Sequence, residues 1–239
     1  MRSVWSVLFA IAMTFSASAA VIFTSNDANI AATGSFDWST LGGVPTEVNN
    51  GFGINATGIT GLSMTVSQSP SPADPSFRVT EQQAPSPPYY FGGSFTNGTP
   101  LLYSFEDTAA PLITFNLNQP VSAFGFYQNN ANRASNVSGT IWAYDALNNL
   151  LATGSASDNA QVSAPQGTAG FLGVYSSDGA ALITRVTYQQ DWVSGNNSVI
   201  SSISTAVPEP STTGFLILGG LVVFFAWGRN SKGLTGRIS

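Results

Sequence analysis

The 239-residue chain contains no cysteine and no histidine, and only 8% of its residues are charged. Without cysteine it can form no disulfide, thiolate nucleophile, zinc finger or iron–sulfur cluster. Without histidine it has no Ser-His-Asp triad and no imidazole ligand for a metal. Lys232 is the only lysine and lies in the C-terminal tail, which argues against Ser-Lys catalysis. We therefore expect a protein that is not an enzyme.

The residues that are present favour a folded, acidic protein. Hydrophobic residues make up 43% of the chain and aromatic residues 12%, which is enough to bury a core. The net charge is −5 and the isoelectric point is about 4.4. An acidic protein repels phosphate backbones, so we expect no nucleic acid partner.

The N-terminus has the pattern of a secretory signal peptide. Arg2 is the only charge before Asp27, an apolar stretch covers 4–15, and small residues fill 16–20. A basic start, a short apolar centre and a small-residue exit are typical of a signal peptide, here residues 1–19. An N-terminal membrane anchor is the alternative, but about a dozen apolar residues are short for a span.

The C-terminus carries a second apolar segment. Residues 211–228 contain no charge, and the basic tail 229–239 follows with Arg229, Lys232 and Arg237. A helix of this length covers about 27 Å, close to the apolar thickness of a bilayer. Positive charge beside a span stays on the cytoplasmic side. We predict a single transmembrane helix at 211–228; a buried core helix is the disfavoured alternative.

A short proline-rich segment, Val207-Pro208-Glu209-Pro210, precedes this helix. Its prolines favour extended backbone. The order Pro-Glu-Pro (208–210), apolar helix, basic tail closely resembles the PEP-CTERM sorting signal of Gram-negative bacteria, here residues 207–239. The resemblance implies that exosortase, a membrane-embedded transpeptidase-like enzyme, recognises and processes the 207–210 segment. It also implies anchoring in the inner membrane before processing, and then a cell-surface or extracellular location.

The remaining ectodomain, residues 20–206, reads as an all-β domain. Its eleven acidic and three basic residues give a net charge of −8. Short runs of alternating apolar residues are divided by Gly, Asn, Ser and Pro, which favours an antiparallel, jelly-roll-like β-sandwich. We also expect a short helix at 36–41, with Phe36 and Trp38 as packing anchors. The expected strands are 62–66, 77–80, 101–105, 112–117, 121–127, 137–145, 169–175, 181–189 and 199–204.

The 108–204 region resembles the jelly-roll ectodomains of many PEP-CTERM proteins in the order of its strand and turn motifs, at 115–121, 123–127, 141–145, 171–175 and 183–188. That architecture is similar to carbohydrate-binding sandwiches. The resemblance supports a fold more than a function.

Three loop aromatics are candidates for stacking on sugar rings, namely Tyr89, Tyr90 and Trp192. Trp142 and Tyr144 share one face of the 137–145 run, and for these two we favour packing inside the sandwich.

The ectodomain sequence contains only weak indications of a catalytic or metal-binding site. Glu106 and Asp107 are the only adjacent acids of the ectodomain, and neighbours on a strand point to opposite faces, so they cannot flank one substrate. We expect no cofactor. Only an oxygen-liganded ion such as Ca²⁺ suits the composition, with Asp145 and Asp178 as weak candidates, and we favour backbone-capping roles for both.

The sequence thus predicts an exported, exosortase-sorted protein of the cell surface or exopolysaccharide matrix. Its ectodomain is expected to be non-catalytic, with exopolysaccharide as a candidate partner. Two alternatives remain: a permanently anchored single-pass envelope protein of structural role, and, least favoured, a Ca²⁺-assisted hydrolase.

Overall fold

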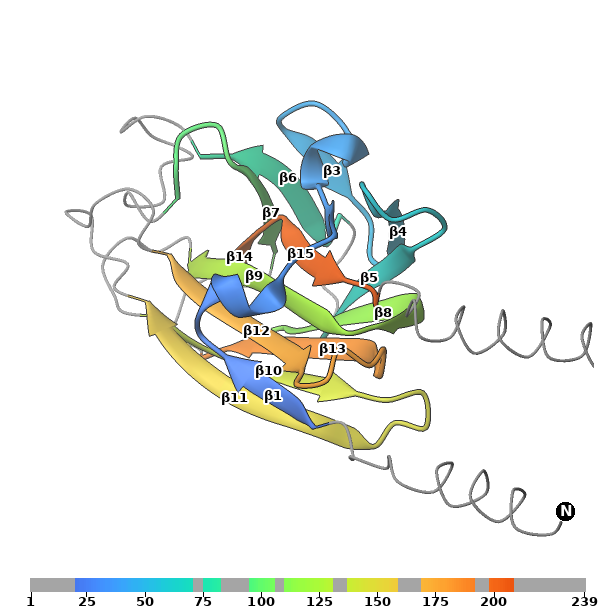
Figure 1. Ribbon diagram of the computed structural model, residues 1–239. Helices are drawn as coiled ribbons and strands as arrows, with labels where there is room; N and C mark the ends of the chain where they lie inside the picture. Colours follow the sequence, from blue (N-terminus) through green and yellow to red (C-terminus); the bar gives the residue numbers. More distant parts are fainter. Residues whose placement is uncertain are drawn as a thin grey trace, which may run out of the picture. The chain divides into compact units, whose positions relative to one another are not determined.

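The computed structural model describes residues 20–70, 75–82, 95–105, 110–130, 137–158, 169–191 and 198–208 (Figure 1). These residues form strands, two short 3-10 helices and their connections. The helices are η1 (Asp27–Ile30) and η2 (Trp38–Leu41). The strands are β1 (Val21–Thr24), β2 (Gly34–Phe36), β3 (Thr46–Val48), β4 (Phe52–Asn55), β5 (Ser63–Ser69), β6 (Phe77–Glu81), β7 (Pro100–Ser104), β8 (Leu112–Val121), β9 (Ala123–Asn130), β10 (Val137–Tyr144), β11 (Leu150–Asp158), β12 (Gly170–Ser176), β13 (Ile183–Gln190), β14 (Ser198–Ser201) and β15 (Ile203–Ala206).

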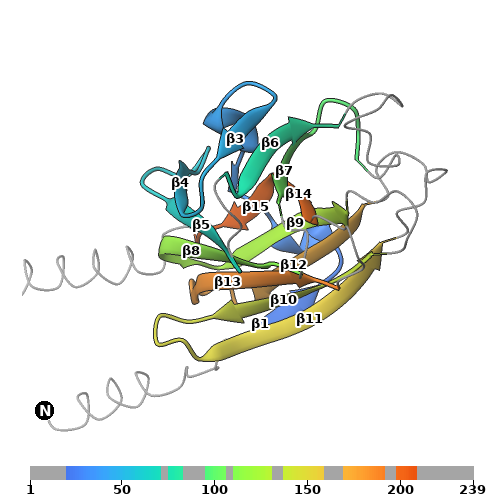
Figure 2. The ribbon, with the colours of Figure 1, turned by 180° about the vertical axis from the view of Figure 1, so that it is seen from behind.

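The strands form two sheets in which every pairing is antiparallel. The nine-stranded sheet follows the order β1-β12-β9-β14-β7-β6-β3, and β15 joins it by pairing with both β9 and β2. The six-stranded sheet has the order β11-β10-β13-β8-β5-β4, and Figure 2 shows β8, β13 and β10 beside one another in its middle. The all-β, two-sheet architecture predicted from the alternating runs is confirmed.

The two sheets bury an aromatic core between them. Phe115 and Tyr188 come from the six-stranded sheet, and Phe124 and Phe126 from the other. The ring centroids of Phe115 and Phe124 lie 5.4 Å apart, and those of Phe126 and Tyr188 lie 5.1 Å apart. Residues of the main core and those packed on it lie between 21 and 207. This unit therefore contains its own core, the property that lets a domain fold alone.

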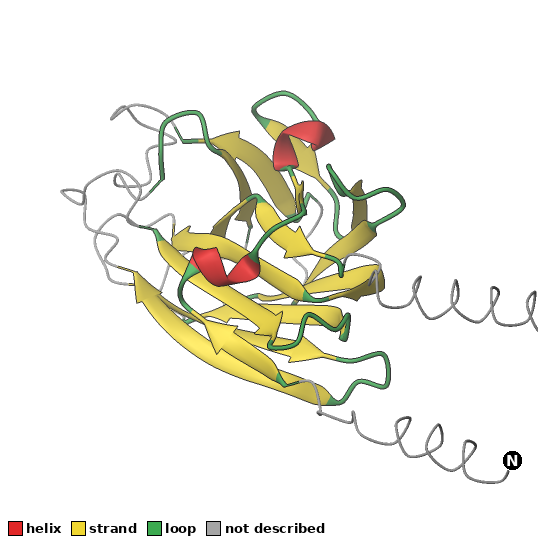
Figure 3. Ribbon diagram, viewed as in Figure 1, coloured by secondary structure: helices red, strands yellow, loops and turns green. Residues whose placement is uncertain are grey.

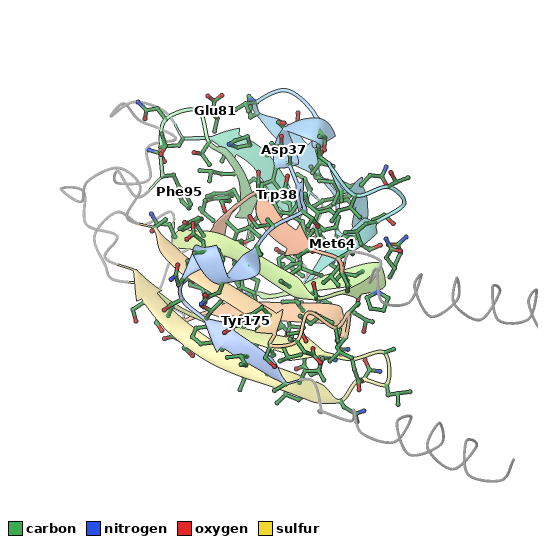
Figure 4. All side chains as sticks on the ribbon, in the orientation of Figure 1. Asp37, Trp38, Met64, Glu81, Phe95 and Tyr175 are labelled. Atoms are coloured by element: carbon green, nitrogen blue, oxygen red, sulfur yellow. The ribbon has the colours of Figure 1, made fainter. Side chains whose placement is uncertain are left out.

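The two short helices, drawn in red in Figure 3, are each held by a side-chain cap. Asp37 caps η2, because its Oδ1 accepts the backbone N–H of Ser39 at 3.0 Å. Trp38, labelled in Figure 4, is fully buried, and its indole N–H donates to the carbonyl of Ser201 at 2.7 Å. The predicted helix near 36–41 is thus a 3-10 turn at 38–41, and Phe36 and Trp38 are confirmed as packing anchors.

Every strand expected from sequence coincides with an observed one to within a few residues. The 199–204 run is an exception in one respect, because it forms two strands, β14 and β15, that break at Ser202. β1 to β4 and the bounds of β11 were not predicted from the sequence. β1 to β4 are three or four residues long, too short to show an alternating pattern.

The last strand ends where the sorting segment begins. Ala206 is buried, the N–H of Val207 donates to Thr33 Oγ1 at 3.2 Å, and Pro208 is exposed. The compact unit ends at Val207, and residues 208–239 form a separate unit. Among the described residues, no helix has the length and apolarity needed to cross a bilayer. The predicted signal peptide at 1–19 and membrane helix at 211–228 lie outside the described residues.

Candidate functional site

Trp142 and Tyr144 do not pack inside the sandwich, so the interpretation favoured from sequence is wrong. Along β10, Ile141 and Ala143 are buried in the core, whereas Trp142 and Tyr144 are only partly buried. Successive residues of a strand point to opposite faces. The two large aromatics therefore lie on the outer face of the six-stranded sheet.

A shallow hollow of about 370 Å³ surrounds these two side chains. It is built on the three adjacent strands β8, β10 and β13, whose register sets Trp142 opposite Thr187 and Thr187 opposite Thr114. Tyr144 and Arg185 also lie opposite each other on β10 and β13. The lining residues are Leu112, Thr114, Trp142, Tyr144, Arg185, Thr187 and Gln189.

Arg185 is fixed against the neighbouring aromatic ring. Its guanidinium carbon lies 4.1 Å from the centroid of the Tyr144 ring, within the range of a cation–π contact. Its Nε is buried and has no hydrogen-bond partner. The guanidinium thus lies over the Tyr144 ring and adds a positive charge to the hollow.

The floor and rim of the hollow are polar. Thr187 is 6% exposed and lies between Trp142 and Thr114 in the strand register. Gln189 is held in place by a hydrogen bond from its Nε2 to the carbonyl of Ala110 at 3.1 Å. Such side chains can donate and accept hydrogen bonds with sugar hydroxyls.

Hydroxyl groups continue across the neighbouring strand. Thr153 of β11 is exposed and pairs with Trp142 in the register. Thr140 and Ser155 exchange a hydrogen bond of 2.8 Å between their hydroxyl oxygens. Short polar side chains therefore surround Trp142 and Tyr144 on the outer face of the sheet.

Asp145 caps the turn between β10 and β11. Its Oδ1 accepts the backbone N–H groups of Leu147 and Asn149, both at 2.8 Å, and its Oδ2 accepts the Asn149 side-chain amide at 2.9 Å. The side-chain and backbone hydrogen bonds from Asn149 hold the pKa of Asp145 below its usual value. Both carboxylate oxygens are engaged within the turn.

Asp178 has a similar local role after β12. Its Oδ1 accepts the Ser176 hydroxyl at 2.7 Å and the N–H of Ala180 at 3.0 Å. The hydrogen bond from Ser176 holds the pKa of Asp178 below its usual value. Among the described residues, no three acidic side chains gather as a metal site would require. The contacts of Asp145 and Asp178 agree with the backbone-capping roles that we favoured for them.

A second hollow, of about 310 Å³, lies beside η1 and is lined in part by Asp27, Tyr127 and Phe171. The Tyr127 hydroxyl donates to Asp27 Oδ2. Burial, followed by that hydrogen bond, raises the pKa of Tyr127 to about 12. Asp27 and Tyr127 are therefore hydrogen-bonded to each other. The ring of Tyr127 packs edge-on against Phe171, with 5.0 Å between the ring centroids.

Several predicted site residues lie outside the described residues. They are the loop aromatics Tyr89, Tyr90 and Trp192, the acidic pair Glu106 and Asp107, the sorting residues Glu209 and Pro210, and the tail cations Arg229, Lys232 and Arg237. Val207 and Pro208 are the sorting residues that the structure describes. The three loop aromatics remain predictions.

A model of the PEP-CTERM protein-sorting motif matches residues 206–230. This match covers the Pro-Glu-Pro segment and the apolar stretch that follows it, and it confirms the resemblance found in the sequence. The chain therefore carries a PEP-CTERM sorting motif at residues 206–230. The motif is an exosortase recognition signal and marks the chain for export with a C-terminal membrane-anchoring tail.

Similarity to other proteins of known structure is low. A DUF4465 family protein from Bacteroides caccae aligns over 60% of this chain and 81% of its own, with 11% identity and a TM-score of 0.35. The enzymatically active domain of tailspike protein 4 from bacteriophage CBA120 aligns over 59% of this chain and 19% of its own, with 16% identity and a TM-score of 0.29. TM-scores this low support no argument about fold or function. No curated protein matches the sequence.

Proposed function

We propose that this exported protein binds polysaccharide through the outer face of its six-stranded sheet and has no catalytic activity. The observation that supports this most is the position of Trp142, a large aromatic that the fold leaves in an open hollow instead of the core. Exposed aromatic rings stack on the apolar faces of sugars, and nearby polar side chains orient the hydroxyls. Trp142, Tyr144 and Gln189 supply that combination.

The composition of the hollow supports binding over hydrolysis. Glycoside cleavage needs two carboxyl groups roughly 5–10 Å apart across the substrate. The seven described residues that line the hollow include no carboxylate. The nearest acid along β10 is Asp145, whose oxygens cap a turn.

The sorting signal supports a role at the cell surface or in the extracellular matrix. Exosortase handles the C-terminal segment, so the ectodomain functions outside the cytoplasm, where exopolysaccharide is the partner that we propose. We also propose a jelly-roll-like topology for the two antiparallel sheets, as the strand motifs of 108–204 imply.

Affinity gel electrophoresis of residues 20–208 tests the binding function. We expect gels that contain the host's exopolysaccharide to retard the wild-type domain, and Trp142→Ala to migrate as in a gel without polysaccharide. Tyr175→Ala, a partly buried tyrosine on β12 of the other sheet (Figure 4), is the matched control and should remain retarded. Equal retardation of wild type and Trp142→Ala, with unchanged melting temperatures, would contradict the proposal.

A further inference from the structure

We propose that the outer-face hollow selects acidic polysaccharide, with a sugar ring stacked on Trp142 and its carboxylate paired with Arg185. This inference rests on the proposed function and adds the chemical class of the glycan. It starts from an imbalance of charge: the ectodomain carries eleven acidic and three basic residues, yet its sugar-stacking aromatics have an arginine at their side.

Within the described part of the chain Arg185 has no anionic partner, unlike Arg78, the other described arginine of the ectodomain. Arg78 forms an ion pair with Glu47, with 2.9 Å between Nη2 and Oε1, and this is the one salt bridge within the residues that the structure describes. Arg185 contacts the Tyr144 ring instead. A ring contact orients the guanidinium but does not neutralise it, so its charge remains available to a ligand.

Two described acids adjoin the strands that carry Tyr144 and Arg185. Asp145 follows Tyr144 in the chain, but its two oxygens accept hydrogen bonds from Leu147 and Asn149. Asp191 is exposed and follows the far end of β13. Neither belongs to the lining of the hollow. An acidic domain therefore presents a local positive site, which would attract an anionic ligand that the rest of its surface repels.

The spacing of the two key side chains suits an acidic sugar. Trp142 lies opposite Thr187, and Arg185 precedes Thr187 by two residues on the same strand. Trp142 and Arg185 are thus diagonal neighbours on one face, about 7–8 Å apart at the backbone. A single sugar residue can span that distance, with its ring on the indole and its carboxylate at the guanidinium. Carboxylate and guanidinium form paired, charge-assisted hydrogen bonds.

The surroundings favour a glycan over an acidic peptide. Hydroxyl groups surround the hollow, on the exposed Thr153 and Ser155 and the partly buried Thr140. An acidic peptide with many carboxylates could form only one charge contact here, with Arg185, because the neighbouring side chains carry neutral hydroxyls. A sugar chain can use the aromatic, the hydroxyls and the cation together.

Titration calorimetry of the full chain in detergent micelles tests the inference. The probes are a galacturonate hexamer and the same hexamer with its carboxyl groups reduced to alcohols. We expect wild type to bind the acidic hexamer about 10-fold more tightly or better, because charge-assisted hydrogen bonds exceed neutral ones by that amount. Arg185→Gln should remove this preference and keep the affinity for the reduced hexamer. Arg185→Lys should retain part of the preference, because lysine keeps the charge without the planar fork.

The outcomes separate this inference from the proposed function. If wild type binds both hexamers equally and Trp142→Ala binds neither, the glycan site stands and the acidic selectivity is wrong. If Arg185→Gln keeps the preference, Arg185 is not its source and the inference also falls. If poly-glutamate binds as tightly as the acidic hexamer, the ligand class is wrong. If wild type binds neither hexamer nor the host polysaccharide, the proposed function fails with the inference.

Discussion

At the scale of single residues, a buried polar pair, Tyr188 and Gln128, joins the two sheets. The Tyr188 hydroxyl donates to Gln128 Oε1 at 2.8 Å, and Gln128 Nε2 donates to the carbonyl of Ala156 at 2.8 Å. Tyr188 and Gln128 are both fully buried. Burial raises the pKa of Tyr188 above its usual value, so the residue stays a neutral donor over the physiological range.

Tyr188→Phe should destabilise the domain. The substitution leaves Gln128 Oε1 buried without a donor, which costs about 1–3 kcal/mol. Urea unfolding of wild type and variant measures this difference, and Tyr175→Phe, on a partly buried tyrosine, should stay within about 0.5 kcal/mol of wild type. An unchanged unfolding midpoint for Tyr188→Phe would show that the pair contributes nothing.

The raised pKa of Tyr127 predicts that the domain loses stability at high pH. Burial and its hydrogen bond to Asp27 raise the pKa of Tyr127 from 10.0 to about 12. A pKa raised in the folded state stabilises the fold fully below pH 10, and that contribution disappears as the pH rises from 10 to 12. Urea midpoints measured across this window should fall more steeply for wild type than for Tyr127→Phe. Parallel curves would contradict the assignment.

At the scale of elements, alternation along a strand predicts which residues share a face but not which face is buried. On β8, Ile113 and Phe115 stand out as the inner set because their neighbours Thr114 and Asn116 are polar. On β10 both faces carry apolar residues, and the larger ones, Trp142 and Tyr144, lie outside.

The residues that surround Trp142 on the outer face come from the neighbouring strands of the sheet. Thr187 and Thr153 flank Trp142, and Thr114 lies beyond Thr187, only because β11, β10, β13 and β8 are neighbours in that order. That register joins segments far apart in the chain, and no single run of sequence contains it. Along β11, polar residues alternate with apolar or small ones, and Thr153 and Ser155 are exposed. This local pattern indicates which face of the strand points to solvent, but it was not used in predicting the face of β10.

The last strand, β15, should be essential for folding. Ile203 is fully buried in the main core, and Thr205 Oγ1 donates to the carbonyl of Ala123 at 2.9 Å. The strand also pairs with both β9 and β2. A chain of residues 20–202 should therefore show no cooperative thermal unfolding, whereas 20–208 should unfold in one transition. Cooperative unfolding of 20–202 would show that β15 is dispensable.

At the scale of the whole molecule, the sorting segment begins where the folded unit ends. Val207 donates its N–H to Thr33, and the next residue, Pro208, begins the Pro-Glu-Pro segment. The sequence analysis found this segment from local order alone, because a sorting signal is read as a linear pattern. The site face, in contrast, depends on strands joined across the chain.

The mature protein should lack its C-terminal apolar segment in cells with active exosortase. The PEP-CTERM motif at 206–230 is the basis of this expectation. Intact mass of the protein purified from such cells, compared with an exosortase-deficient strain, measures the difference. Retention of residues 211–228 in both strains would favour the permanently anchored alternative.

Contact between Trp142 and the glycan is the basis of the proposed binding function. Residues 20–208 contain three tryptophans, Trp38, Trp142 and Trp192, whose indole N–H signals can be assigned in NMR spectra by single Trp→Phe variants. We predict that added exopolysaccharide shifts the Trp142 signal and leaves that of the buried Trp38 unchanged. A shift of the Trp192 signal alone, or no shift at saturating polysaccharide, would contradict the claim.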